Sequence, residues 1–377
     1  MKKKFKPTFK KEIVLFMPFI GGGGVEKNLY LISNYLSKKL GRIFLITSSK
    51  KYGFKFNKKI QLITPKKNLS ENLNIRFKYL ICLFLLFKFL LKNRKSLVFS
   101  FQANIYCIIL CKLMNVKIIT RSNSSPTGWY HNFFKNFVYK KIINLSDSII
   151  VNSIEFKKEM QNRYNVNCIC IYNPLDKKEI LKKAKKKINF NFFNEKIKLR
   201  ILNIGRLTDQ KDQITLLKSI YLLNSQRLKI KFKVLIMGRG VMKDRLIDFI
   251  KEKKLNKIVK IIKFQDNPYP YIKKCNLFVL TSKYEGLPNV LLESLVLKKF
   301  IISSNCPTGP KEILLNGKAG YLFKVSNHID LFEKILKFIR NKKNLKHKIN
   351  FGYKNLNKFE YRKNIHKYYL EVEKFLN

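Results

Sequence analysis

The sequence predicts an α/β protein made of two domains, each with a parallel sheet. Short apolar runs typical of buried strands alternate with helical segments along the chain. The length of 377 residues exceeds that of one ordinary domain, and an apolar content of 46% suffices for two packed cores. A lysine-rich run at 177–187 breaks the alternation after Asn173-Pro174. We therefore expect a first domain over 1–173, a linker over 174–197 and a second domain over 198–359.

Apolar runs predict the strands, and apolar residues at helical spacing predict the helices. In the first domain the expected strands cover 12–19, 42–47, 96–101, 117–120, 148–152 and 169–172, and helices cover 25–40 and 154–164. Gly41 suits the C-cap of the first helix. In the second domain strands are expected at 200–204, 232–237, 259–264, 277–280 and 300–303, and the tail from 330 is helical and highly charged.

The most informative stretch runs from Ser282 to Glu293, directly after a predicted buried strand. Gly286 permits a tight turn, and Pro288 suits the first position of a helix. Glu285 then lies on the turn and Glu293 on the second turn of the helix. Carboxylates accept hydrogen bonds from hydroxyls, and a helix N-terminus attracts phosphate. This combination is what a nucleotide-sugar site requires; the alternative is a capped surface helix with incidental acids.

A second loop, Gly21 to Gly24, lies between a predicted strand and a helix, where backbone amides can approach an anion. A dinucleotide-binding motif would place a glycine where Glu26 stands and an acid where Thr47 to Lys50 stand. The pattern therefore argues against a nicotinamide-dependent dehydrogenase. A turn without a ligand is the alternative.

Arg206 and Lys211 follow Gly205 at another strand end. Arginine can donate two parallel hydrogen bonds to phosphate oxygens, and lysine supplies a compact positive charge. Together they could hold a diphosphate and stabilise it as it leaves, although a chance pair is the alternative in a chain with 79 Lys and Arg. D-x-D pairs are absent near these strand ends, and the four histidines lack metal spacing. We expect no metal.

The formal net charge of +56 is spread over the whole chain, without the interleaved aromatic platforms of a nucleic-acid binder. It favours an anionic membrane surface as partner and argues against nucleic acid. The seven cysteines lack C-x-x-C spacing, which indicates a reducing compartment.

The longest apolar run, 79–91, carries Lys88 and is shorter than the roughly 18 residues of a membrane span. It is either a core helix or a helix lying in the membrane interface. The basic start of the chain resembles a first strand more than a signal peptide.

Taken together, these motifs resemble the family 4 glycosyltransferases, retaining enzymes with the GT-B fold of two facing Rossmann-like, doubly wound domains around a central cleft. The matching residues span almost the whole chain. They are Gly23 to Glu26, Asn173-Pro174, Gly205-Arg206-Leu207 with Gln210-Lys211-Asp212, Gly238-x-Gly240, Glu285-Gly286-Leu287-Pro288-Asn289 with Glu293, and Gly309-Pro310 with Glu312-Ile313. The two glutamates combined with the Arg206 and Lys211 element are specific, whereas either element alone is only indicative.

The resemblance implies catalytic roles for Glu285, Arg206 and Lys211. Arg206 and Lys211 would bind the donor diphosphate, Glu293 the ribose, and Glu285 the sugar being transferred. The implied donor-binding residues are Gly23, Gly24, Arg206, Lys211, Gly286, Leu287, Pro288, Asn289 and Glu293. Many members have a histidine in the sugar pocket where this sequence has Arg121-Ser122-Asn123. Arg121, Asn123 and His131 are therefore the candidate sugar or acceptor contacts.

The implied reaction moves a hexose or N-acetylhexosamine from a nucleotide sugar, most simply a UDP-sugar, to a lipid-linked or polysaccharide acceptor with retention of configuration. It belongs to the synthesis of bacterial surface glycans such as lipopolysaccharide, capsule or O-antigen, and it needs no cofactor besides the donor. We expect a cytoplasmic enzyme, peripheral on the inner face of the membrane. The donor would lie on the second domain and the acceptor on the first, onto which the last helix, about 360–377, packs back. A nucleotide-sugar epimerase of the same fold and a non-catalytic basic binder of membranes or nucleic acid are the rivals.

Overall fold

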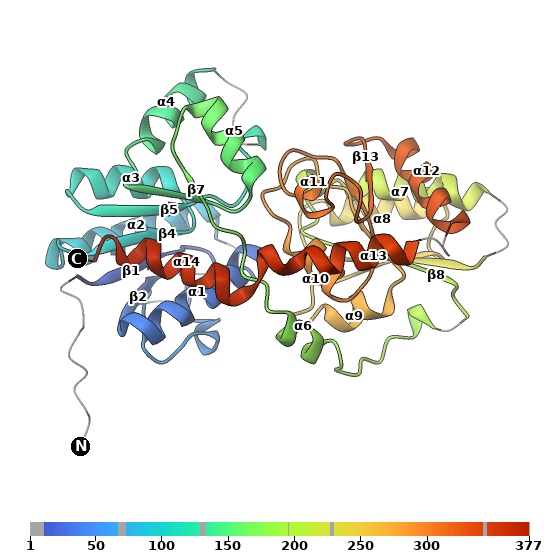
Figure 1. Cartoon of the computed structure of the whole chain (residues 1–377), viewed down its shortest axis with the longest axis horizontal. Coiled ribbons are helices and arrows are strands. Elements are labelled where there is room, and N and C mark those ends of the chain that lie inside the picture. The colour runs from blue at the N-terminus through green and yellow to red at the C-terminus, as the bar shows by residue number, and fades with distance from the viewer. Residues whose placement is uncertain are drawn as a thin grey trace. The chain divides into compact units, whose positions relative to one another are not determined.

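The computed structural model describes residues 11–66, 73–128, 133–194, 196–226, 230–341 and 345–376. The chain divides into two compact units (Figure 1). The first unit takes the described residues up to Pro174 and those from Tyr361 onward, and the second takes Leu175–Glu360.

The first unit is built on a parallel sheet that has seven strands in the described residues, in the order β3-β2-β1-β4-β5-β6-β7. The strands are β1 (Ile13–Phe16), β2 (Ile43–Ile46), β3 (Ile60–Ile63), β4 (Leu97–Ser100), β5 (Lys117–Arg121), β6 (Ser148–Val151) and β7 (Ile169–Cys170). The helices are α1 (Gly24–Leu40), α2 (Ile75–Lys92), α3 (Asn104–Leu113), α4 (Phe133–Ile143), α5 (Ile154–Tyr164) and α14 (Tyr361–Glu373), with 3-10 turns η1 (Gly53–Lys55) and η2 (Pro126–Gly128). Because β1 pairs with β2 on one side and β4 on the other, the strand order reverses at β1, as in a Rossmann fold.

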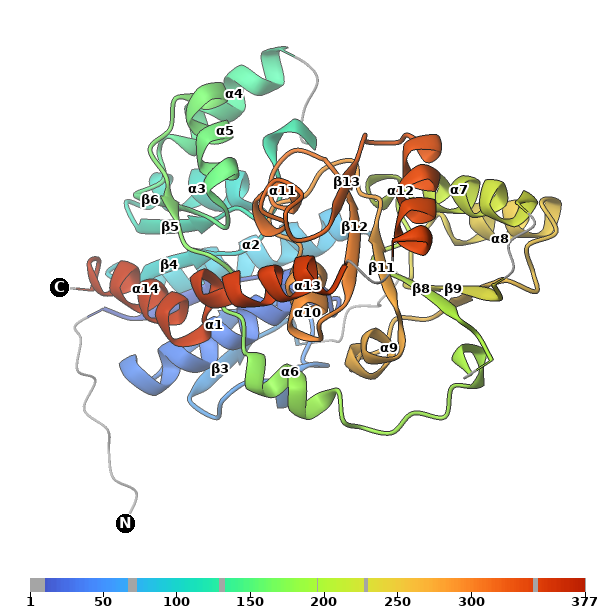
Figure 2. The same ribbon diagram turned by 45° about the vertical axis from the view of Figure 1, so that its right-hand side comes forward.

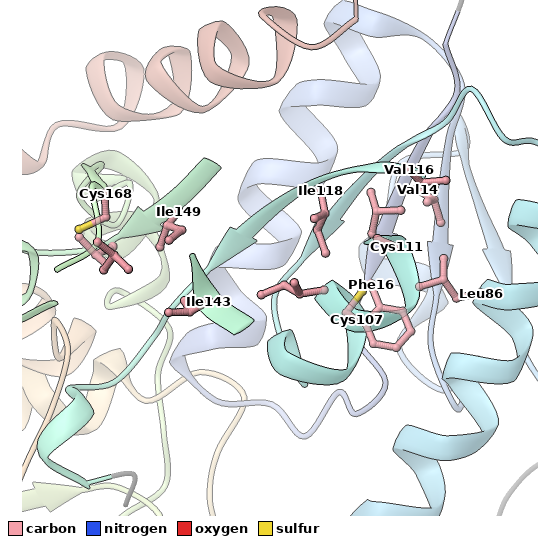
Figure 3. Close-up of a cluster of buried hydrophobic side chains, with 14 of the residues drawn as sticks. Val14, Phe16, Leu86, Cys107, Cys111, Val116, Ile118, Ile143, Ile149 and Cys168 are labelled. Carbon is pink, nitrogen blue, oxygen red and sulfur yellow. The ribbon is translucent and has the colours of Figure 1, made fainter. Parts of the chain in front are cut away.

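Helices cover both faces of this sheet because its strands are apolar on both sides. On one face, α1 and α14 pack against alternate residues such as Leu15 and Leu45. On the other face, α2, α3, α4 and α5 pack against the intervening residues such as Val14 and Ile118. Figure 3 shows this second core, with Leu86 of α2 and Cys107 of α3 turned toward the strands.

The second unit repeats the plan with a parallel sheet of six strands in the described residues, in the order β10-β9-β8-β11-β12-β13. Its strands are β8 (Leu199–Ile204), β9 (Phe232–Met237), β10 (Val259–Ile262), β11 (Leu277–Leu280), β12 (Phe300–Ser304) and β13 (Tyr321–Phe323). Its helices are α6 (Lys177–Lys183), α7 (Gln213–Ser225), α8 (Lys243–Glu252), α9 (Tyr269–Lys274), α10 (Asn289–Val296), α11 (Pro310–Ile313), α12 (His328–Arg340) and α13 (Leu345–Lys354), with 3-10 turns η3 (Asn191–Phe193), η4 (Asp209–Lys211) and η6 (Asn355–Phe359). Helices α7, α8 and α12 share one core with the sheet, while α10 contacts β11 and β12. Figure 2 shows β8, β11 and β12 side by side in this unit.

The fold class predicted from the sequence, two Rossmann-like doubly wound α/β domains, is confirmed. The segment 174–197, expected to be a linker between the domains, packs against the second unit. Its helix α6 contacts α9 and α10, and Leu175 donates its amide to the carbonyl of Phe359 at 2.9 Å, so it packs as part of the second unit. At the other end of the chain, α14 contacts α1 and belongs to the first unit.

Candidate active site

The candidate site lies in the second unit, at the carboxyl ends of the neighbouring strands β8 and β11. The loop after β8 carries Arg206 and Lys211, and the loop after β11 carries Glu285. Strand order reverses at β8, since β9 pairs on one side and β11 on the other. The carboxyl edge at such a switch point is where open parallel sheets bind ligands.

Glu285 is held by neighbours from three loops. Its carboxylate accepts a hydrogen bond from Ser282 Oγ at 2.7 Å and forms an ion pair with Lys211 Nζ through the same oxygen, Oε1. The backbone carbonyl of Glu285 accepts from Thr308 Oγ1 at 2.6 Å. The side chains of Lys211 and Glu285 are only 16% and 9% exposed. The direction of this carboxylate is therefore set by the protein itself.

A second set of contacts joins the basic loop to the acidic loop. Gln210 donates its Nε2 to the carbonyl of Tyr284 at 2.9 Å, and its own carbonyl accepts the amide of Lys283 at 2.8 Å. The Gln210 Oε1 also accepts from Arg206 Nη2 at 3.0 Å, while Arg206 itself is exposed. Gln210 thus links the exposed guanidinium to the loop that carries Glu285.

The loop after β12 packs closely, through Gly309, against the loop that carries Glu285. This residue has φ 86°, and a Cβ built there would lie 2.2 Å from the carbonyl oxygen of Gly286. Both the backbone conformation and the close approach require glycine. Gly309 therefore sets the position of the turn that leads into α10.

Glu293 lies on α10 in different surroundings. It is buried and accepts a hydrogen bond from the hydroxyl of Tyr269, on α9, at 3.3 Å. The expected position of the acids, one on the turn and one on the helix, is confirmed, and each acid has its own partners. Pro288, expected as the first helical residue, is instead the N-cap and has extended backbone, so that α10 begins at Asn289.

The surroundings of Glu285 also affect a nearby thiol. Burial, followed by the negative charge of Glu285, raises the pKa of Cys306 to about 12. The Cys306 thiol therefore stays neutral at physiological pH and adds no negative charge beside Glu285.

In the first unit, the amides of the glycine loop have an internal partner. Glu26 accepts the amide of Gly21 at 3.0 Å and that of Gly23 at 2.9 Å, in a capping box at the start of α1. The amide of Gly23 thus has a partner within the loop, and the donor-binding role expected for Gly23 stays a prediction. Gly24 is the first residue of α1.

Arg121 is not a substrate contact. Its side chain is fully buried, donating from Nε to the hydroxyl of Tyr368 at 3.0 Å and from Nη2 to Asn173 Oδ1 at 2.6 Å. The expected contact is wrong because α14 packs over β5, where its Tyr368 hydroxyl accepts a hydrogen bond from the guanidinium of Arg121. Asn123 donates to the carbonyl of Phe101 at 3.0 Å, and its buried Oδ1 has no hydrogen-bond partner among the described residues. His131 lies outside the described residues.

Sequence reasoning missed Tyr269, Ser282 and Thr308. Tyr269 stands on a different helix from Glu293, and no spacing rule connects them. Ser282 lies inside the quoted motif and could have been found from its position three residues before Glu285.

Among the described residues, no cluster of three or more His, Cys, Asp or Glu is arranged to hold a metal ion. Within the same residues, every helix is too short or too polar to cross a membrane.

Comparison with known proteins finds similarity to glycosyltransferases. Residues 184–355 match the family model "Glycosyl transferases group 1". The chain is 28% identical over 337 residues, 86% of its own length and 88% of the relative's, to N-acetylgalactosamine-N,N'-diacetylbacillosaminyl-diphospho-undecaprenol 4-alpha-N-acetylgalactosaminyltransferase of Campylobacter jejuni.

Solved structures show the same fold along the whole chain. The Anabaena HepE protein in complex with UDP and glucose has a TM-score of 0.77 and 14% identity, covering 97% of this chain and all of that one. A glycosyltransferase from Rickettsia africae has a TM-score of 0.74 and 17% identity, covering 98% of this chain and all of that one. Residues 184–355 thus form a glycosyl transferases group 1 domain, and the protein is a glycosyltransferase with the GT-B fold.

Proposed function

We propose that the protein transfers a hexose or N-acetylhexosamine from a UDP-sugar to a lipid-linked or polysaccharide acceptor, with retention of configuration and without a metal ion. The observation that carries the proposal is the cluster of Arg206, Lys211 and Glu285 at one sheet edge, with Glu293 on the helix that follows. Two cations for a diphosphate and two separately held carboxylates for hydroxyls match the chemistry of a sugar donor.

The diphosphate would be held by Lys211 and Arg206. The Lys211 ammonium has three N–H donors, and its contact with Glu285 uses one of them, so that two remain for phosphate oxygens. Arg206 is exposed and can fork onto a second phosphate group. These charges would stabilise the diphosphate as negative charge develops on it, a task that other enzymes give to a metal ion.

The carboxylates would position the sugars. Glu293, oriented by Tyr269, would accept the ribose hydroxyls, and Glu285, oriented by Ser282, would accept a hydroxyl of the transferred sugar. In the transfer step the bond between the anomeric carbon and the phosphate oxygen breaks. A bond to the acceptor oxygen forms on the same face, and the acceptor proton passes to the leaving phosphate. In the first unit, Asn123 is the proposed sugar contact, because the residue is partly exposed whereas Arg121 is buried.

The choice of donor and acceptor draws on the relatives. Several structural neighbours are complexes with UDP, and the Campylobacter relative is named for an undecaprenol-linked substrate and an N-acetylgalactosaminyl group. The O-antigen enzyme WclY of Escherichia coli is 30% identical over 139 residues. We therefore assign the protein to the synthesis of bacterial surface glycans, as a peripheral enzyme on the cytoplasmic face of the membrane.

The test is a panel of UDP-, GDP- and ADP-sugars, incubated with polyprenyl-diphosphate-linked glycan acceptors in the presence and absence of EDTA. We expect transfer from a UDP-sugar, no loss with EDTA, and an anomeric configuration by NMR that equals the donor's. Transfer from another nucleotide, inversion, or dependence on a metal would each overturn the corresponding part.

A matched pair of variants tests the site itself. Glu285→Gln should lower kcat by about a thousandfold, as loss of a group that acts in the transition state does. Glu252→Gln, an exposed glutamate of α8, should leave kcat unchanged. If Glu285→Gln keeps full activity, the assignment of this carboxylate is wrong.

A further inference from the structure

Exposed apolar side chains are concentrated on three consecutive helices of the first unit. Twelve of the twenty-two large apolar side chains that are exposed in the described part of the chain belong to α2, α3 and α4. They are Ile75, Phe77, Leu80, Phe84, Phe87 and Leu91 on α2, Tyr106, Ile109 and Leu113 on α3, and Phe134, Phe137 and Val138 on α4. We call these residues the apolar face. A monomeric water-soluble protein rarely exposes so many large apolar groups together.

On α2 the exposed residues form a continuous stripe. Phe77, Leu80, Phe84, Phe87 and Leu91 follow one another at intervals of three and four residues, which places them on one side of a helix. With a rise of about 1.5 Å per residue, the stripe is about 21 Å long. A different side of α2 supplies the residues that pack in the core, so the helix is apolar on both its inner and outer surfaces.

The three helices form one surface because they lie in one layer. Each of them contributes to the core on the same face of the sheet, and α3 contacts both α2 and α4. Figures 1 and 2 both show α3 and α4 on the same side of β5. Helix α5 belongs to the same layer but exposes polar residues such as Lys158 and Arg163. Exposed large apolar side chains are thus concentrated on α2, α3 and α4, whereas α5 contributes a single one, Ile154.

The charge of this region is strongly one-sided. Residues 73–147 contain twelve Lys and Arg and a single acid, Asp147, which pairs with Lys112 and Lys117. The exposed basic residues on and beside the apolar face are Arg76, Lys88, Lys92, Arg94, Lys95, Lys135 and Lys141. On α2 the ammonium of Lys88 lies 4.5 Å from the centroid of the Phe84 ring, so that charge and apolar surface are adjacent.

We infer that the apolar face is the surface by which this protein docks on an anionic lipid bilayer. Aromatic and aliphatic side chains would enter the boundary between headgroups and acyl chains, while the surrounding lysines and arginines meet lipid phosphates. A second copy of the chain would bring the same positive charge and be repelled. The inference gives a location to the membrane contact in the proposed function, yet it can be measured without any sugar donor.

The first test measures binding to vesicles of phosphatidylcholine with about 30% phosphatidylglycerol, an anionic composition typical of such measurements. The triple variant Phe77→Ser, Phe84→Ser, Leu91→Ser should bind at least tenfold more weakly. The control Leu181→Ser, Tyr221→Ser, Ile329→Ser removes three other exposed large side chains from the second unit and should bind as the parent does. Equal losses in both variants, or none in the first, overturn the inference.

The second test changes charge alone. Lys88→Glu, Lys92→Glu, Arg94→Glu should lower the affinity for anionic vesicles by at least a hundredfold, since each lysine or arginine near such a surface contributes about 1 kcal/mol. An unchanged affinity for anionic vesicles would also overturn the inference.

Three further measurements distinguish membrane docking from damage to the catalytic site, from self-association and from RNA binding. Transfer to a short, water-soluble acceptor should be unchanged in both triple variants of the first unit, so that loss of vesicle binding is distinguished from loss of the catalytic function. If analytical ultracentrifugation shows that the parent is an oligomer and that the Phe77, Phe84, Leu91 variant is a monomer, the apolar face is a protein interface and the inference is wrong. Tight binding to RNA that the same variant loses would contradict it equally.

Discussion

The ion pair between Lys211 and Glu285 predicts a measurable coupling between two residues that are 74 positions apart. Lys211→Ala leaves the carboxylate with the Ser282 hydroxyl as its remaining side-chain donor. Glu285→Gln leaves the ammonium without a carboxylate. Removing one partner of a fully buried pair costs about 3–5 kcal/mol, and the residual exposures of 16% and 9% place the present pair near the lower limit, at about 2–3 kcal/mol for each single variant.

The double variant distinguishes a direct pair from two independent effects. With both charges gone, no buried ion remains unpaired, so the double variant should cost about as much as one single variant. The coupling free energy is then about 2 kcal/mol, within the range that contacting charged groups give in double-mutant cycles. If the two single effects instead add to within about 0.5 kcal/mol, the contact does not exist in solution as described.

The assay must resolve the two units, because each has its own core and the chain need not unfold in one step. Native-state hydrogen exchange of peptides that span β8 and β11 reports the opening free energy of the second unit. Peptides from β1 and β4 serve as the internal control and should not change.

The same variants separate binding from chemistry. Lys211→Ala should weaken the binding of UDP, measured by calorimetry, by at least tenfold, because it would remove the proposed contact with the diphosphate. Glu285→Gln should leave the Kd for UDP within about threefold of the parent while transfer is lost, because the proposed partner of that carboxylate is the transferred sugar. Equal effects of both variants on UDP binding would contradict the separate roles.

Three other perturbations test particular contacts. Tyr368→Phe leaves the buried Nε of Arg121 without its acceptor, so deuterium exchange in the peptide 361–376 should speed up by the equivalent of about 1–3 kcal/mol. Unchanged exchange would show that the hydrogen bond between Arg121 and Tyr368 does not stabilise α14. Gly309→Ala forces a Cβ to within 2.2 Å of a carbonyl and should raise the Kd for UDP at least tenfold, whereas Gly317→Ala, with the same φ of 86° but no atom nearer than 3.9 Å, should not. At Asp147, burial tends to raise the pKa, but the hydrogen bonds from two lysines and a backbone amide lower it overall from the ordinary 3.8. Its stabilising effect is present above that value and is lost as the pH falls through the lowered pKa. Asp147→Asn should therefore cost about 1 kcal/mol at pH 7, by chemical denaturation, and progressively less below pH 3.8; a constant difference would refute the argument.

Much of the fold could be predicted because strands and helices leave local patterns. The strands at 232–237 and 277–280 and the helix at 154–164 match their predicted limits residue for residue. Strand β3, with Gln61 exposed between apolar neighbours, was missed, because four residues give too weak a pattern beside a loop.

The candidate site was predictable in part. Arg206, Lys211 and Glu285 stood out because they follow glycines or strands at positions where loops reach a ligand, and the structure brings them together through Gln210. Arg121 was misassigned for a reason outside its own neighbourhood. The tyrosine that occupies its guanidinium lies 247 residues later in the sequence, and no local pattern reveals that contact.

Residue order over short distances was enough to predict the two α/β halves, the strand ends at which charged residues gather, and the resemblance to a glycosyltransferase. The tertiary structure was needed to show which charged groups have partners within the protein. It showed Glu26 holding the glycine loop, Arg121 buried under α14, and Lys211 set against Glu285. It also decided that one side of α2 is core while the other is exposed, because burial depends on what packs against a helix, and an apolar sequence alone does not specify its neighbour.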